Sequence, residues 1–221
     1  MASNGSGDSV VVIGLGRFGG AVADSLVRLG HEVLAIDESP KLVTQWADVI
    51  THVAQADSTD EEALRQLGVA EFRHAVVAIG TAIEASVLTV LALTELKVPQ
   101  IWAKAVSAKH GKILSSVGAH HVVYPEASMG ERVAHLITGR MLDYIEFDDG
   151  YAIAKVSAPR EAIGRTLADS ALRTAYGITV VGVKVPGQDF AHAQPDTVIP
   201  PGAILVVAGR TDQVERFAAT P

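Results

Sequence analysis

The chain has 221 residues, a formal net charge of −7 at pH 7, a hydrophobic share of 48% and no cysteine. Its length suits one large domain or a medium and a small one, and its negative charge disfavours nucleic acid as a main partner. The absence of cysteine excludes disulfides, thiolate zinc sites and cysteine nucleophiles, and it fits a cytoplasmic protein. Because no apolar run reaches about 18 residues, we expect no direct insertion into a membrane.

The predicted elements begin, after a flexible leader over residues 1–8, with a strand, a glycine-rich turn and a helix. Val10–Ile13 is a β-branched run typical of a buried strand, and GLGRFGG follows it at residues 14–20. A second strand, Glu32–Ile36, ends in Asp37. Strand, G-x-G-x-x-G turn, helix, strand and acid form, in this order, the fingerprint of dinucleotide-binding folds. We therefore expect an adenine nucleotide in the first half of the chain.

The residues of this fingerprint each have an expected role. Gly14 allows the tight turn, Gly16 lets backbone approach a pyrophosphate, and Gly19 lets the helix pack close to the strand. The phosphates would lie at the helix N-terminus, where free N–H groups and the dipole favour anions. Asp37 can accept hydrogen bonds from a ribose diol and would repel a 2′-phosphate, so NADP is not expected. Arg17 lies inside the turn, where a guanidinium can bind phosphate oxygens or remain in solvent.

Helices and strands continue to alternate up to residue 138. The further strands are predicted at Val49–Val53, Ala75–Ile79, Ile101–Ala105 and Val122–Tyr124. The helices are predicted at 40–47, from a capping box at Ser58 or Thr59 to Leu67, at Ile83–Leu96, at 108–117 and from Glu126 to Thr138. Because apolar strands between helices form a parallel sheet covered on both faces, we predict an α/β, Rossmann-like domain over residues 9–139.

The pattern changes after Gly139. From Leu142 a strand, an Asp149-Gly150 turn and a second strand are predicted, and the later elements are a helix near 166–175, the strands Ile178–Val185 and Ala203–Ala208, and a helix near 211–218. We therefore predict a small α+β lobe over residues 140–221.

Three polar residues lie where an open α/β sheet presents its ligand crevice. Asp57 follows the third strand and is a candidate ligand, because Ser58 or Thr59 can already cap the next helix. Lys104 follows a buried strand and is interpreted as a solvated lysine, with a phosphate or interface contact as the alternatives. Glu126 starts a helix, where a carboxylate complements the dipole. No paired acid and base for catalysis stands out, which argues against an enzyme.

The whole pattern after the leader resembles the KtrA/TrkA-type regulatory subunits of bacterial potassium transport systems. The resemblance is carried by GLGRFGG at 14–20, GHEVLAID at 30–37, DSTD at 57–60, VAIG at 77–80, IWAK at 101–104, YPE at 124–126, MG at 129–130, YG at 176–177 and PGAILVVAG at 201–209. KtrA is the closer of the two types, because Gly-Arg-Phe-Gly and Pro-Glu both fall in place. The implied fold is a Rossmann-like RCK N-terminal domain followed by an RCK C-terminal lobe.

The resemblance also implies ligands. The implied nucleotide-binding residues are Gly14, Gly16, Arg17, Phe18, Gly19, Asp37, Asp57, Ser58 and Lys104. Arg17 would contact the terminal phosphate of ATP or ADP, and Glu126 would hold Mg²⁺, Ca²⁺ or Na⁺ where two subunits meet. Cyclic di-AMP is a candidate ligand near Arg173, Tyr176 and Ile178, although Arg173 could equally be a surface residue and Ile178 a core residue.

The implied function is regulation of potassium transport by nucleotide. Homodimers would assemble into an octameric ring that lies at the inner face of the cell membrane, bound to a separate potassium-translocating subunit. The alternatives are an NAD(H)-binding TrkA-like or antiporter-linked regulator, a stand-alone nucleotide sensor and, from another class, an NAD-dependent oxidoreductase.

Overall fold

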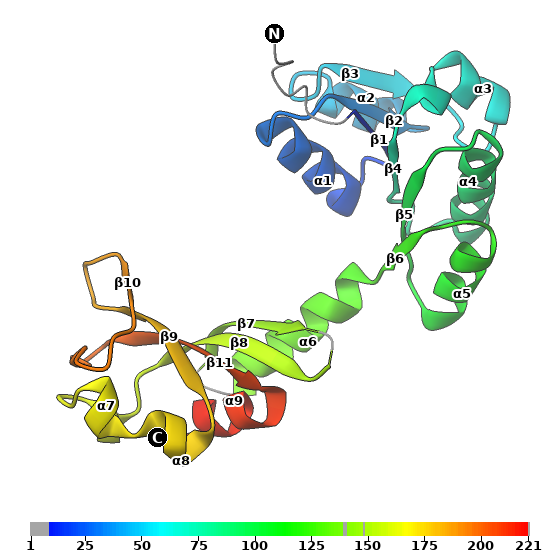
Figure 1. Ribbon diagram of the computed structural model, residues 1–221. Coiled ribbons are helices and arrows are strands. Elements are labelled where there is room, and N and C mark those ends of the chain that lie inside the picture. The colour runs from blue at the N-terminus through cyan, green and yellow to red at the C-terminus, as the bar shows by residue number, and fades with distance from the viewer. Residues whose placement is uncertain (1–8, 139–140, 148, 221) are drawn as a thin grey trace, which may run out of the picture. The chain divides into compact units, whose positions relative to one another are not determined.

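The computed structural model describes residues 9–138, 141–147 and 149–220, so the expected leader at residues 1–8 lies outside the described residues. The chain divides into two compact units, residues 1–126 and 127–221 (Figure 1). The sequence-based domain limits, 9–139 and 140–221, instead keep the helix that follows Tyr124 with the first lobe. Part of that helix packs on the core of the second unit through Leu136.

The first unit is built on a six-stranded parallel sheet with the strand order β3-β2-β1-β4-β5-β6. Its strands are β1 (Val10–Ile13), β2 (Val33–Asp37), β3 (His52–Gln55), β4 (His74–Val77), β5 (Gln100–Lys104) and β6 (His121–Val123). Its helices are α1 (Arg17–Arg28), α2 (Pro40–Trp46), α3 (Glu61–Gln66), the 3-10 turn η1 (Val69–Glu71), α4 (Ile83–Glu95) and α5 (Ala108–Ser116). Strand β1 lies in the middle of the sheet, successive strands are added outward to β3 on one side, and the order reverses at β4, which lies on the other side of β1. The predicted Rossmann-like topology is therefore confirmed.

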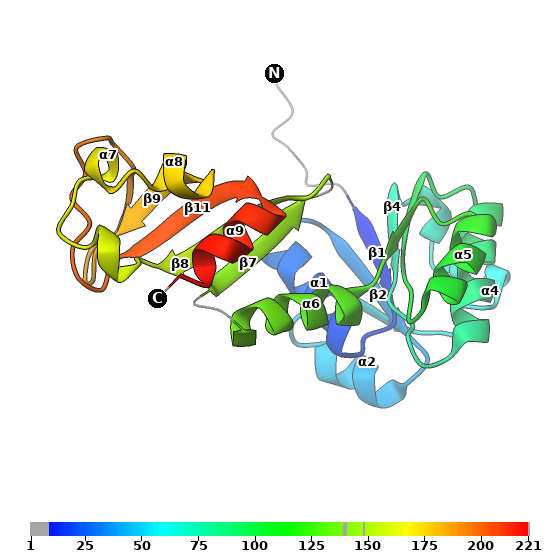
Figure 2. The ribbon, with the colours of Figure 1, turned by 90° about the horizontal axis from the view of Figure 1, so that it is seen from below.

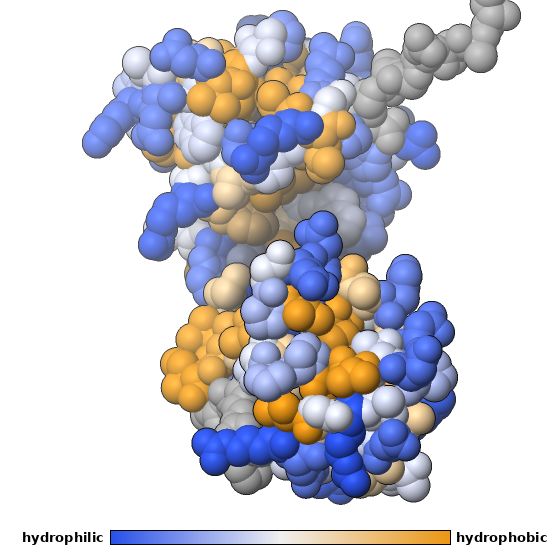
Figure 3. Space-filling model, turned by 90° about the vertical axis from the view of Figure 1, so that its left-hand side faces the viewer, coloured by the Kyte–Doolittle hydropathy of each residue, from blue (hydrophilic) through white to orange (hydrophobic). Residues whose placement is uncertain are grey.

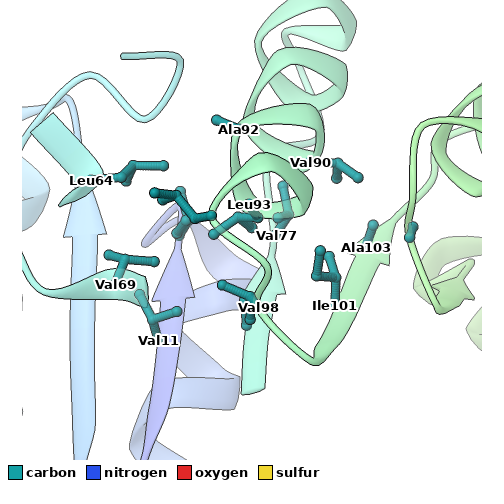
Figure 4. Close-up of a cluster of buried hydrophobic side chains, with 14 of the residues drawn as sticks. Val11, Leu64, Val69, Val77, Val90, Ala92, Leu93, Val98, Ile101 and Ala103 are labelled. Atoms are coloured by element: carbon teal, nitrogen blue, oxygen red, sulfur yellow. The ribbon is translucent and has the colours of Figure 1, made fainter. Parts of the chain in front are cut away.

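Alternate residues of the central strands build two hydrophobic layers, one on each face of the sheet. On one face Val10 and Val12 pack with Ala23 of α1 and Trp46 of α2. On the other face the inward-facing residues of β1, β4 and β5 pack with η1 and with helices α3 and α4 (Figure 4). Figure 1 shows α1 on one side of these strands and α4 and α5 on the other. Burial of both faces explains why β1 and β2 consist almost entirely of apolar residues.

Most predicted elements of the first unit lie within two residues of the observed bounds, but the third strand and the start of the helix after it are wrong. The third strand is His52–Gln55, because Val49 and Ile50 donate their backbone N–H groups back to Trp46 O and so end α2. Helix α3 is capped by Asp60, whose side chain accepts from the N–H groups of Glu62 and Ala63. The predicted capping box at Ser58 or Thr59 is therefore wrong.

The second unit contains a five-stranded antiparallel sheet with the order β10-β9-β11-β8-β7. Helix α6 (Pro125–Thr138) leads into it, and the remaining elements are β7 (Met141–Phe147), β8 (Tyr151–Ser157), η2 (Arg160–Ala162), α7 (Leu167–Ser170), α8 (Leu172–Tyr176), β9 (Thr179–Lys184), β10 (Phe190–His192), β11 (Ile204–Arg210) and α9 (Thr211–Ala218). Helix α9 packs across β8 and β11 (Figure 2). The predicted α+β lobe is confirmed.

The second unit differs from its sequence prediction in two places. The single helix expected near 166–175 is two short helices, because Ala171 adopts a left-handed conformation with φ +51° that ends one and begins the next. Strand β10 was not predicted, since three exposed residues carry no periodic signal.

Apolar side chains are not confined to the interior. On β8, Ala152 and Ala154 face the core, while the register places Ile145 of β7 on the opposite face with 54% exposure. Apolar residues form the orange areas on the surface in Figure 3. Within the described ranges, no helix is long and apolar enough to cross a membrane.

Candidate functional site

The glycine turn after β1 is closed on one side and open on the other. Gly14 has φ +93°, and its N–H donates to Ile36 O at 2.8 Å. A Cβ on Gly19 would lie 1.8 Å from Gly14 O, so helix α1 can pack this close to the turn only because residue 19 is glycine. A Cβ on Gly16 would meet no atom within 4 Å, and Gly16 caps α1 without a side-chain hydrogen bond. The first N–H groups of α1 therefore lie behind an open backbone surface, as a bound phosphate requires.

Asp37 at the end of β2 holds this turn in place. Its Oδ2 accepts from the N–H of Leu15 at 2.6 Å, and its Oδ1 accepts from the N–H of Ser39 at 2.8 Å. This structural role was not predicted. Each carboxylate oxygen has a second lone pair, so the side chain can still accept from a ribose hydroxyl.

The two candidates after β3 have different surroundings. Asp57 is exposed, and its Oδ1 accepts from the hydroxyl of Thr59 at 2.7 Å and from its N–H at 2.9 Å, which lowers the pKa of Asp57 below its usual value. Ser58 is 8% exposed, and its Oγ lies 2.8 Å from Oγ1 of Thr89 on α4. The hydroxyl of Ser58 thus joins the turn between β3 and α3 to α4 in the interior, and its side chain has little surface to offer a nucleotide.

Lys104, the last residue of β5, is 9% exposed, so its interpretation as a solvated lysine is wrong. Its Nζ lies 2.5 Å from Oε1 of Glu126 and 5.7 Å from the ring centroid of Phe18. Gly80 packs against the ammonium group of Lys104, since a Cβ on Gly80 would be 3.0 Å from Nζ. The sequence places Gly80 at the end of the fourth predicted strand but assigns it no role beside Lys104.

Glu126 is more accessible than its partner, with a side chain that is 66% exposed. The hydrogen bond from Lys104 lowers the pKa of Glu126, and its own backbone N–H and the charges of Lys104 and Arg17 act in the same direction. The carboxylate is therefore held ionised beside the start of α1. In the part of the chain that the structure describes, no three His, Asp or Glu side chains are grouped to hold a metal ion. A cation at Glu126 would thus need oxygens from phosphate or from a second chain.

A second unpredicted contact stabilises the turn from the side. The indole N–H of Trp46 donates to Leu15 O at 3.1 Å. The ring lies where a Cβ on Gly20 would be, 2.1 Å from Cζ2 of Trp46. The sequence signal for this contact is Gly20, the fourth glycine of GLGRFGG, which lies outside the G-x-G-x-x-G fingerprint.

The residues of the first unit converge because they follow strands of one parallel sheet. Gly14, Asp37, Asp57 and Lys104 come at the carboxyl ends of β1, β2, β3 and β5, which share one edge. Between β1 and β4 the strand order reverses, which is where open α/β sheets bind ligands. The open helix N-terminus, the acid at the second strand and the cations Arg17 and Lys104 fit an adenine nucleotide.

The three candidates of the second unit do not share one surface. Arg173 on α8 is exposed. The hydroxyl of Tyr176 donates to Glu161 Oε1 at 2.7 Å, and its ring meets Phe217 edge-on at 5.1 Å. Ile178 is 0% exposed, so its side chain belongs to the core, and the predicted ligand contact of Ile178 would need the lobe to open.

Comparison with known proteins gives the same two parts. A TrkA-N domain matches residues 10–125, and a TrkA-C domain matches residues 151–220. Ktr system potassium uptake protein A of Bacillus subtilis (strain 168) is 38% identical over 207 residues, which cover 93% of each chain. Ktr system potassium uptake protein C of the same organism is 40% identical, covering 93% of this chain and 94% of its own.

A solved structure has the same fold over the full chain. The GsuK channel bound to NAD matches with a TM-score of 0.67 at 19% sequence identity, covering 100% of this chain and 41% of the channel chain.

Proposed function

This chain belongs to the KtrA-type family, with its TrkA-N and TrkA-C domains, and on that premise we propose that it is a nucleotide-sensing regulatory subunit for potassium uptake. The observation that carries the proposal is the open N-terminus of α1 behind Gly16, with Asp37 one strand away. The relatives are named for potassium uptake, so we propose that the bound nucleotide controls transport and is not chemically converted.

ATP and ADP are the proposed ligands, and Arg17 is the proposed discriminator. Arg17 is exposed at the first residue of α1, so its guanidinium can reach a terminal phosphate beyond the helix N-terminus. A ligand shifts a conformational equilibrium only through unequal affinity for the two states. We propose that the γ-phosphate supplies this difference in affinity. The copies of the chain would form a ring, expected to be octameric. The ring would bind a potassium-translocating membrane subunit at the inner membrane face.

A cation is proposed as a further ligand. Glu126 contributes one ionised carboxylate near the N-terminus of α1, and Mg²⁺, Ca²⁺ or Na⁺ between this carboxylate and a phosphate would reduce their repulsion. Crystals grown with ATP and Mn²⁺ would show an anomalous peak at Glu126. The cation role is excluded if the peak is absent and if Glu126→Gln leaves the cation dependence of transport unchanged.

Cyclic di-AMP is proposed for the second unit on the family resemblance, with Arg173 and Tyr176 as candidate contacts. The exposed guanidinium of Arg173 suits a phosphate, and the ring of Tyr176 could stack on a base. Loss of binding in Arg173→Ala would support this assignment, and unchanged binding would remove it.

The alternative ligand is NAD(H), because the GsuK channel with this fold was solved with NAD. Calorimetric titration with ATP, ADP, NADH and NADPH separates the two. We expect ATP and ADP to bind and NADPH not to bind, and the ATP/ADP proposal fails if only NADH binds. An absorbance change of NADH with candidate substrates would instead favour the oxidoreductase.

Arg17→Ala tests the discriminator directly. It should lose more affinity for ATP than for ADP, because the charge-assisted contact to the terminal phosphate disappears. Arg28→Ala, in the last turn of the same helix and paired with Asp24, is the matched control and should change neither affinity. Equal losses for both nucleotides would make Arg17 a general electrostatic contact.

A further inference from the structure

The Lys104–Glu126 ion pair joins two parts of the chain with different surroundings. The ammonium of Lys104 is almost enclosed, whereas the carboxylate of Glu126 is largely in solvent. A nearly buried charge needs a partner, because the desolvated ammonium is costly if it is left alone. Glu126 supplies that partner from the first turn of α6, so the bond ties the carboxyl end of β5 to the beginning of this helix.

The same ammonium lies next to the proposed phosphate site. Its Nζ lies over the ring of Phe18, the second residue of α1, and beside Gly80 at the loop after β4. A phosphate at the N-terminus of α1 would therefore lie near both members of the pair. Its negative charge would attract Lys104 and repel Glu126, and both effects are larger in a partly desolvated site.

We propose that in the nucleotide-free protein the carboxylate of Glu126 is the ion-pair partner of Lys104. When a nucleotide binds, its phosphates pair with Lys104 instead, and Glu126 is released. This inference rests on the proposed nucleotide site and adds to it a competition inside the chain. The exchange would make the first turn of α6 sensitive to the phosphates, because its tie to β5 is broken when they bind. Released Glu126 is then available to a cation or to a second copy of the chain.

The competition predicts opposite effects for the two partners. Calorimetric affinities for ATP, ADP and adenosine would be measured with a chelator present, so that no divalent cation contributes. Glu126→Gln should bind ATP and ADP about fivefold more tightly or better, because the ammonium no longer has to leave its carboxylate. Lys104→Met should bind both nucleotides more weakly by a similar factor. Neither change should alter adenosine binding, because adenosine has no phosphate.

The double variant Lys104→Met with Glu126→Gln separates competition from simple repulsion. If Glu126 acts through Lys104, its replacement should give little gain once Lys104 is absent. If Glu126 only repels phosphate through space, the gain should be equal or larger in the Lys104→Met background, and the proposal is then wrong. Glu131→Gln on α6 and Lys112→Met on α5 are matched controls at exposed positions and should leave all three affinities unchanged.

A measurement on the unaltered protein covers the case in which Lys104→Met does not fold. The carboxyl ¹³C resonance of Glu126, assigned with Glu126→Gln, should move toward the position of a free glutamate when ATP or ADP is added. Adenosine should not move it. A resonance that ATP leaves in place would overturn the exchange. Failure of adenosine, ATP and ADP alike to bind would instead contradict the nucleotide site itself.

Discussion

The two sheets of this chain differ in how they gather polar side chains. In the parallel sheet of the first unit, every strand ends at the same edge, so Gly14, Asp37 and Lys104 converge although they lie far apart in sequence. In the antiparallel sheet of the second unit, successive strands end at opposite edges, and the candidates there are exposed at Arg173 and buried at Ile178. Residues that follow successive strands are thus brought to one edge only where the strands are parallel.

Unfolding of the first unit can be followed by a signal of its own in solution. Both tryptophans, Trp46 and Trp102, belong to the first unit. Tryptophan fluorescence therefore reports unfolding of the first unit, whereas far-ultraviolet circular dichroism reports both units.

The largest expected effect tests whether Ile178 is a core residue. Ile178→Ala should lower the free energy of unfolding of the second unit by about 4 kcal/mol, because it removes methyl groups at a position with 0% exposure. Urea titration would show the loss by circular dichroism and not by tryptophan fluorescence. Arg173→Ala is the exposed control and should stay within about 0.5 kcal/mol. A small effect at Ile178 would return this residue to the list of candidate ligand contacts.

Within the first unit, two glycines of the turn should behave differently. Gly19→Ala should cost about 3 kcal/mol by tryptophan fluorescence, because its Cβ would overlap Gly14 O at 1.8 Å. Gly16→Ala has free space and φ −64°, so it should cost only about 1 kcal/mol, the usual penalty of alanine at a helix N-cap. Its methyl group should nevertheless weaken ATP binding, because it occupies the side from which a phosphate approaches. Normal ATP binding by Gly16→Ala would place the phosphates elsewhere.

Ser58→Ala tests whether this residue contributes to packing of the first unit or to nucleotide binding. Ser58→Ala should cost about 1–2 kcal/mol, because the buried hydroxyl of Thr89 loses its partner at 2.8 Å. Calorimetry should show unchanged nucleotide affinity. Thr59→Ala, whose hydroxyl binds the exposed Asp57, is the control with the smaller effect on stability. A loss of affinity in Ser58→Ala without a loss of stability would contradict the packing role.

The smallest effect is a pH dependence confined to the first unit. His110 is 2% exposed, and burial lowers its pKa below the ordinary 6.5. The imidazole of His110 therefore takes up a proton at higher pH in the unfolded chain than in the folded one. Its neutral form is fully compatible with folding above pH 6.5, and the free energy of unfolding falls as the pH drops below this value. The second unit's histidines, His135 and His192, are not buried. His110→Gln should flatten this dependence in tryptophan-detected melting, and an unchanged slope would assign it to other groups.

The sequence alone determined the features that depend on neighbouring residues. Strand β1, the turn from Gly14 to Gly19 and Asp37 at the end of β2 were predicted, because their signals are steric and local. The alternation of apolar strands and helices was sufficient for the parallel sheet of the first unit. The change of pattern after Gly139 was sufficient for an α+β second unit.

Only the tertiary structure decided which polar side chains are enclosed. Lys104 and Glu126 are 22 positions apart in sequence, and Ser58 and Thr89 are 31 apart. No local pattern encodes either pair, so the sequence leaves Lys104 between a solvated lysine and a phosphate or interface contact. It likewise leaves Ser58 between a helix cap and the nucleotide contact that the resemblance implies. Burial and pairing depend on how whole elements pack, and a side chain's environment is contributed mostly by residues distant along the chain. For that reason the sequence predicted the edge of the sheet at which we propose that a nucleotide binds, while the fold decided which charges meet at that edge.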